Sequence, residues 1–285
     1  MTRPNAVADQ SSHYSRLDNI PTMPLIGEGI AKPIPAPTDE LDPETRKKIE
    51  QARDQQRAIR EQAIKRYQVA SMAYIGAMVR KRDDVSAVWE RIVDKWLEGK
   101  LSSYQAVSDS GEPQKFRIFL KTVLRNEVYA FSRERARDAQ RGPVRLPSEY
   151  DAVDTLEATA SEAFDRGIQD TIISRALEAV RVEDTLYYET LRLLMNSAAS
   201  DSKSVRSKEL AECLTRLSDK RISEDNARKI KERSKLMLSR KIIDQVGLFI
   251  EDNDLDRIED ALKDWDLIRY CKKTIDEMRR KGSSQ

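Results

Sequence analysis

Apolar residues recur at helical spacing in several long stretches of the chain, and polar stretches separate them. The clearest stripe follows Asp83 and Asp84 and runs through Val85, Val88, Trp89, Ile92, Val93, Trp96 and Leu97. A second stripe lies in 116–137 and comprises Phe116, Phe119, Leu120, Val123, Leu124, Val128 and Phe131. The spacing predicts two amphipathic helices that pack face to face, with a loop over 101–113 between them.

The same pattern predicts helices over most of the remaining chain. Asp42 and Pro43 resemble an N-cap followed by a proline in the first helical turn, so we expect a helix from Pro43 to about Lys81. Only its second half has enough apolar residues to pack. Further helices are predicted at 168–180, 184–195, 207–217, 224–246 and 265–280. These helices predict an all-α fold.

Polar and proline-rich stretches divide the chain into two small helical domains. Residues 1–42 are rich in proline and predict a disordered tail. A helical bundle is expected at 43–140 and a helix-turn-helix domain at 168–246. An acidic linker with at most weak helix is expected at 141–167, and an acidic helical extension at 247–285.

Charge alternates along the chain in blocks that the net value of +2 conceals. Bases outnumber acids eleven to four in 44–82 and thirteen to six in 203–241. Acids outnumber bases eleven to three in 149–189 and nine to two in 244–266. Basic blocks separated by acidic ones favour surfaces for a polyanion, joined by segments that avoid it.

The helix predicted from residue 116 has a basic flank opposite its apolar stripe. Arg117, Lys121 and Arg125 recur every four residues, and Arg133 and Arg135 continue the positive run. Asn126 lies in the same run with a side chain that both donates and accepts hydrogen bonds. This flank favours an anionic partner, and an ordinary solvated helix face is the alternative.

A helix-turn-helix pattern follows in the second domain. A short helix around Ala211, which is small enough for a close helix crossing, leads through a turn to Ser223 in the N-cap position of a basic helix. That helix places polar side chains where recognition helices contact DNA: Asn226, Arg228, Lys229, Lys231 and Arg233. A plain surface helix is again the alternative.

The sequence contains no pattern for catalysis, a cofactor or a metal. The single histidine lies in the tail, the glycines form no phosphate-binding loop, and Cys213 and Cys271 are isolated. We expect a protein that is not an enzyme and needs no cofactor. The sequence also has no apolar leader and no apolar run of ~18 residues, which predicts a cytoplasmic protein without a membrane partner.

Four segments together resemble the extracytoplasmic-function group of bacterial RNA polymerase sigma factors. Residues 83–96 and FRIFLKTVLRNEV at 116–128 look like the second conserved region of that family, although Ser86 stands where the family usually has an acid. ELAE at 209–212 and NARK at 226–229 look like the fourth region. The resemblance covers about 150 residues, from Asp83 to Val246 without most of the linker.

The resemblance implies a transcription initiation factor that binds core RNA polymerase and directs it to promoters. It implies that these residues meet the polymerase: Asp83, Asp84, Trp89, Glu90 and Val93. The basic flank would face the upstream promoter element where the strands open, through Arg117, Lys121, Arg125, Asn126, Arg133 and Arg135. The second basic helix would enter the major groove of the more distant element, so both duplex and locally melted DNA are expected partners. An anti-sigma or other regulatory protein is a further expected partner.

Two other functions stay open. A stand-alone helix-turn-helix regulator would use only residues 171–246 and would bind DNA tightly without polymerase. A helical adaptor of the anti-sigma type would bind protein through its helices, with solvated basic faces and no contact to DNA.

Overall fold

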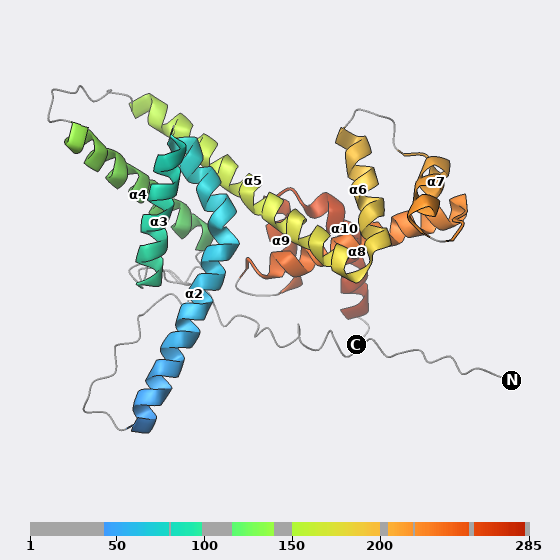
Figure 1. Ribbon diagram of the computed structural model, residues 1–285, viewed down its shortest axis with the longest axis horizontal. Helices are drawn as coiled ribbons and strands as arrows, with labels where there is room; N and C mark the ends of the chain where they lie inside the picture. Colours follow the sequence, from blue (N-terminus) through green and yellow to red (C-terminus); the bar gives the residue numbers. More distant parts are fainter. Residues whose placement is uncertain are drawn as a thin grey trace. The chain divides into compact units, whose positions relative to one another are not determined.

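A computed structural model describes residues 43–79, 81–98, 116–139, 150–199, 205–218, 220–250 and 254–282. All regular structure in these ranges is helical (Figure 1), which confirms the all-α class for the described part of the chain. The expected tail 1–42, the loop 101–113 and the first residues of the expected linker, 141–149, lie outside these ranges. The helices belong to two compact units, 1–64 with 93–119 and 65–92 with 120–285.

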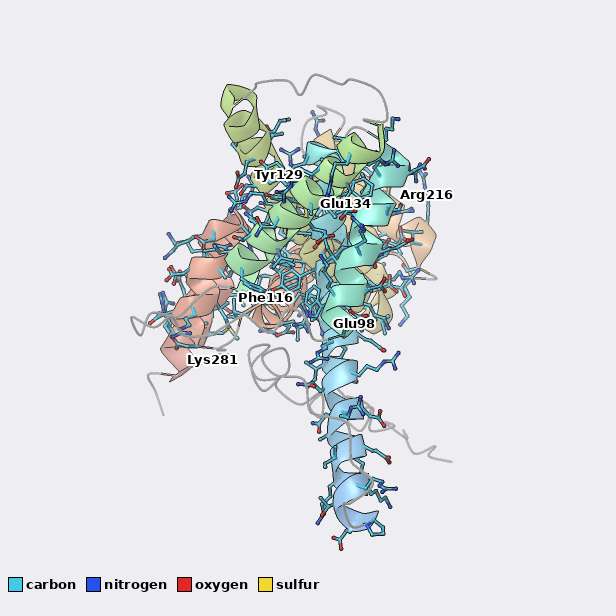
Figure 2. All side chains as sticks on the ribbon, turned by 90° about the vertical axis from the view of Figure 1, so that its left-hand side faces the viewer. Glu98, Phe116, Tyr129, Glu134, Arg216 and Lys281 are labelled. Carbon is cyan, nitrogen blue, oxygen red and sulfur yellow. The ribbon has the colours of Figure 1, made fainter. Side chains whose placement is uncertain are left out.

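The first unit contains the beginning of α2 (Pro43–Met78), the end of α3 (Arg82–Leu97) and the beginning of α4 (Phe116–Ala139). The first turns of α2 are polar, and Figure 2 shows their side chains projecting on all sides. The core of this unit is aromatic, because the buried ring of Trp96 lies 5.6 Å from that of Phe116. The two predicted apolar stripes therefore meet here as expected.

The second unit is organised around α5 (Tyr150–Glu183) and α8 (Glu224–Gly247), which pack against each other. The helix α6 (Thr185–Ala199) packs on both, and α7 (Ser207–Leu217) packs on α6 and α8. The last two helices, α9 (Leu255–Asp264) and α10 (Ile268–Gly282), pack on α8 and on each other.

Aromatic residues from four parts of the second unit share one core. The ring of Tyr67 in α2 stacks on Phe164 of α5 at 6.5 Å and meets Phe249 edge-on at 5.4 Å. Phe249 in turn lies 5.8 Å from Trp265. Residues that follow α8 thus pack in the same core as α2 and α5.

Residues 150–167, expected to be part of an acidic linker with at most weak helix, instead form the first half of α5. Buried residues recur every four positions along this helix, at Ala160, Phe164, Ile168, Ile172, Ala176 and Val180. This continuous apolar face needs partners, and α2 and α8 supply them. The helices α2 and α5 come so close at Gly167 that a Cβ there would lie 2.7 Å from Cα of Ala70.

The C-terminal region also differs from the expectation. The last helix begins at Ile268 instead of 265, and the acidic segment before it contains α9. Trp265 is the C-cap of α9 and is buried. Asp266 links the two helices with a φ of 50°, a left-handed conformation that aspartate tolerates better than most residues. None of the helices in the described ranges combines the length and apolar content that a membrane crossing requires.

Candidate nucleic-acid interface

The helices α7 and α8 form a helix-turn-helix within the second unit. A small core of buried residues joins them, made of Leu210, Ala211, Leu214 and Ala227. Ala211 lies between the two helices, as its size predicted. Leu186 and Leu193 of α6 pack against this core, so the motif is fixed to the rest of the unit.

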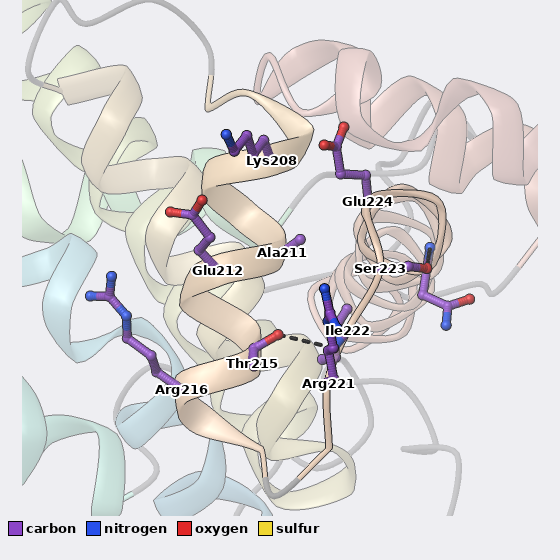
Figure 3. A pocket seen from close by; sticks show the side chains of 10 residues that line it. Lys208, Ala211, Glu212, Thr215, Arg216, Arg221, Ile222, Ser223 and Glu224 are labelled. Atoms are coloured by element: carbon purple, nitrogen blue, oxygen red, sulfur yellow. Dashed lines mark hydrogen bonds between the residues drawn. The ribbon is translucent and has the colours of Figure 1, made fainter.

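Hydrogen bonds fix the turn between the two helices. The backbone N–H of Ser218 donates to the carbonyl oxygen of Leu214 at 3.0 Å, which ends α7. The backbone N–H of Ile222 donates to Thr215 Oγ1 at 2.9 Å (Figure 3). Ser223 Oγ then accepts a hydrogen bond from the backbone N–H of Asn226 at 3.3 Å, which confirms Ser223 as the N-cap of α8.

The beginning of α8 presents polar side chains to solvent. Asn226, Arg228 and Lys229 are all exposed. Arg228 Nε donates to Ser207 Oγ at 3.1 Å, and its Nη1 lies 3.5 Å from Asp225 Oδ1. Exposed contacts of this kind contribute little stability, so the guanidinium can exchange them for an external acceptor.

Along the rest of α8, the side chains pass from solvent-exposed positions to positions in contact with other helices. Lys231 is half-buried and Arg233 is exposed, so both of these predicted residues in the third turn keep some access to solvent. Further along, Ser239 Oγ lies 2.5 Å from Thr274 Oγ1 of α10, and Lys241 Nζ lies 2.7 Å from Glu183 Oε2 of α5. The second half of α8 is therefore anchored to α5 and α10, and the basic first half projects from this anchored part.

An open cavity of about 670 Å³ lies where α7, the turn and the start of α8 meet (Figure 3). Three basic residues that were not predicted as site residues border it together with Asn226: Lys208, Arg216 and Arg221. Lys208 and Arg216 are eight positions apart, close to two helical turns, and lie on the face of α7 opposite the buried Leu210 and Leu214. That spacing could have identified them from the sequence.

The basic flank of α4 is engaged by α5. Lys121 Nζ lies 2.9 Å from Asp165 Oδ2 and 2.8 Å from Ser161 Oγ. Arg125 Nη1 lies 2.8 Å from Glu157 Oε1. All three partners belong to the segment that was expected to be a linker.

The other predicted residues of α4 are placed differently from one another. Asn126, Arg133 and Arg135 are exposed, and Arg135 also forms an ion pair with Asp84 at the start of α3. Arg117 is half-buried in the first unit. Asn126, Arg133 and Arg135 are thus the more accessible members of the predicted set on α4.

The residues predicted to meet polymerase are only partly accessible. On α3, Asp83 and Glu90 are exposed and Val93 is half-buried. Trp89 is 6% exposed, so it packs in the core. Asp84 is held by Arg135.

Within the described ranges, no group of three or more His, Cys, Asp and Glu residues could hold a metal ion. No family model, curated protein or solved structure matches the chain. The function must therefore be inferred from the residues of the chain itself.

Proposed function

We propose that this protein is a sigma-like transcription initiation factor, which binds core RNA polymerase and directs it to promoter DNA. The observation that most directly supports the proposal is the exposed start of α8, held at a fixed angle by the α7–α8 core and capped by Ser223. Recognition helices place the side chains of their first turns against base edges in the major groove. In α8 these side chains are Asn226, Arg228 and Lys229.

The chemistry of these side chains suits base and phosphate contacts. An asparagine amide pairs with the major-groove edge of adenine, and an arginine fork pairs with guanine. We assign these roles to Asn226 and Arg228. Lys229, Lys231 and Arg233 are assigned to phosphates, which position the protein without carrying sequence information.

Acids at the start of α8 limit non-specific binding. Glu224 and Asp225 occupy the first turn and are exposed. A capped helix N-terminus attracts phosphate, and two carboxylates at the same place oppose that attraction. Free protein is therefore expected to bind duplex DNA weakly, and the polymerase supplies the remaining affinity.

The second promoter contact is assigned to α4 and the polymerase contact to α3. Asn126 and Arg133 are accessible on α4, whereas Lys121 and Arg125 must exchange Asp165 and Glu157 for DNA phosphates. On α3 the outward acids Asp83 and Glu90 are assigned to polymerase, while Trp89 maintains the helix packing.

A stand-alone helix-turn-helix regulator is the second candidate function. The ion pairs of Lys121 and Arg125 favour it, because they leave the α7–α8 motif as the more accessible basic surface. This candidate predicts tight and specific DNA binding by the protein alone. The sigma-like proposal predicts that specific binding requires polymerase.

The test combines a pull-down of core RNA polymerase with run-off transcription on genomic fragments. The sigma-like proposal predicts that polymerase is retained and that discrete transcripts start at defined sites. Specific DNA binding without polymerase retention would replace it with the stand-alone regulator. Retention of a protein partner with no promoter selectivity would indicate the anti-sigma-type adaptor.

Replacing Arg228 provides the residue-level test. If Arg228 reads a base, Arg228→Ala weakens promoter binding by about 1–3 kcal/mol and relaxes selectivity at one base position. The matched control is Lys272→Ala, which removes an exposed positively charged side chain from α10. Binding of the two variants is compared by titrating labelled promoter in the presence of polymerase. An equal loss of affinity for all DNA sequences would indicate that Arg228 contacts phosphate. No loss of affinity would show that Arg228 does not contact DNA.

A further inference from the structure

An arginine is buried in α2, in the half that looked polar on every side. Arg60 is 6% exposed, whereas its neighbours Arg57 and Glu61 keep contact with solvent and pair with each other at 3.1 Å. Arg60 Nη1 donates to the carbonyl oxygen of Leu97, the last residue of α3, at 3.1 Å. In the described part of the chain, its Nε and Nη2 are buried and have no hydrogen-bond partner.

The two unpartnered nitrogens form one edge of the guanidinium group. Nε–H and one Nη2–H point in the same direction, so they can donate two parallel hydrogen bonds to one oxyanion. The Nη1 bond to Leu97 fixes the orientation of this edge. A buried guanidinium without an anionic partner is strongly destabilising, and burial lowers the pKa of Arg60 accordingly.

The buried arginine lines a cavity of about 670 Å³ in the first unit. Arg53 and Arg57 line it as well, and their spacing places them on the same face of α2 as Arg60. Glu98, which follows α3, borders the other side. The cavity thus has three guanidinium groups on its wall, of which Arg57 is paired with Glu61. The Nε and Nη2 atoms of Arg60 are buried, so an anion in the cavity reaches them only after a small shift of the surrounding side chains.

We infer that this cavity binds a single oxyanion, a carboxylate or a phosphate group, on the Nε–Nη2 edge of Arg60. The acids that also line the cavity, Glu50, Asp54 and Glu98, repel an extended polyanion such as a DNA backbone. One small anionic group bound at Arg60 meets less of that repulsion, and the positive charges of Arg53 and Arg57 offset part of it. The site lies on α2 and the end of α3 and does not depend on the DNA-binding proposal.

The test measures how the full chain responds to inorganic phosphate and, separately, to acetate. Each anion is titrated against chloride at the same ionic strength, and the thermal unfolding midpoint is recorded. Binding to the folded state raises the midpoint in a concentration-dependent way. If only phosphate raises the midpoint, the ligand is a phosphate group. If only acetate raises it, the ligand is a carboxylate. A rise with both assigns an oxyanion site of broad selectivity.

Arg60→Met removes the buried fork and keeps an apolar side chain of similar length. We expect this variant to unfold in chloride at a midpoint equal to or above that of the parent, and to bind either anion at least tenfold more weakly. Arg82→Met is the matched control, because Arg82 is exposed and lies outside the cavity. The control should keep the anion response of the parent.

Two results would overturn the inference. The first is a parent protein that responds to neither anion, and the second is an anion response that persists in Arg60→Met. Where Arg60→Met does not fold, Arg60→Lys takes its place, since lysine keeps the charge but has no two-point fork. A folded Arg60→Lys without the response supports the site, and an unchanged response refutes it.

Discussion

At the scale of single residues, Gly167 determines how closely α5 approaches α2. A Cβ at this position would lie 2.7 Å from Cα and 3.1 Å from the backbone nitrogen of Ala70. Both atoms belong to the main chain of α2, so rotation of a side chain cannot relieve the contact. Glycine is required here by space and not by backbone conformation.

We predict that Gly167→Ala destabilises the protein by about 1–3 kcal/mol, because overpacking at a backbone contact forces the two helices apart. Gly76→Ala is the matched control on α2, where an added Cβ meets no atom within 4 Å. That change should stabilise by about 0.5–1 kcal/mol, since alanine has the higher helix propensity. Urea unfolding of both variants measures the difference. Equal effects would mean that α2 and α5 do not cross closely at Gly167.

Local rules predicted some residues of the candidate site and could not predict others. Ser223 as an N-cap and Ala211 at a helix crossing follow from side chains that lie within a few positions along the chain. Arg60 and Arg125 have partners 37 and 32 positions away. Such pairs depend on how helices pack, so the sequence showed a polar helix and a basic flank where the structure has a buried arginine and an ion pair.

At the scale of elements, α7 shows what periodicity and caps can determine, and α5 shows what they leave open. The bounds of α7 agree with the prediction, and α8 ends one residue later than expected. The first half of α5 was mistaken for a linker because acidic residues surround its apolar ones. Its stripe from Ala160 to Val180 repeats every four residues, and this repeat was the available signal.

The pairing of α5 with α4 leads to a prediction about DNA binding. Glu157 and Asp165 neutralise Arg125 and Lys121 in the free protein. In a Glu157→Gln/Asp165→Asn variant both cations become available, while the buried face of α5 is unchanged. If the flank of α4 meets DNA, this variant should bind promoter DNA more tightly, with a salt dependence steeper by up to roughly two counterions.

The control for this prediction is Glu162→Gln/Asp170→Asn, which removes two exposed acids from the same helix. Both double variants gain the same net charge, so a general charge effect raises the affinity of both equally. If Lys121 and Arg125 are specifically released, the two double variants differ in the salt dependence of DNA binding. A salt titration followed by fluorescence anisotropy measures this difference. Identical behaviour would assign the two cations to helix packing alone.

At the scale of the whole molecule, the alternation of charge along the chain has a structural counterpart in the second unit. Much of the acidic block that begins at residue 149 lies in α5, where Glu157 and Asp165 pair with Arg125 and Lys121 of α4. The acids of α9 find a partner as well, because Glu259 pairs with Arg279 of α10 at 2.8 Å. In these contacts the acidic side chains pair with basic side chains of neighbouring helices, whereas the basic side chains at the start of α8 project into solvent.

Global stability should fall in alkaline solution because two acidic groups are buried in neutral form. Burial raises the pKa of the Cys271 thiol from 9.0 to about 11. Burial also raises the pKa of the Tyr74 hydroxyl from 10.0 to about 12, and the negative charge of Glu157 adds to that rise. Above pH 9 the unfolded chain releases protons that the folded chain retains, which favours unfolding.

The free energy of unfolding is therefore expected to be unaffected by these groups below pH 9. It should fall between pH 9 and about 11 because of Cys271, by up to ~3 kcal/mol, and between pH 10 and about 12 because of Tyr74. Cys271→Ser removes the thiol, so its stability should decline less between pH 9 and 11 than that of the parent. Cys213→Ser is the control, because it makes the same substitution at a half-buried cysteine. Urea unfolding at a series of pH values tests this, and parallel profiles for parent and Cys271→Ser would show that Cys271 does not titrate from a buried position.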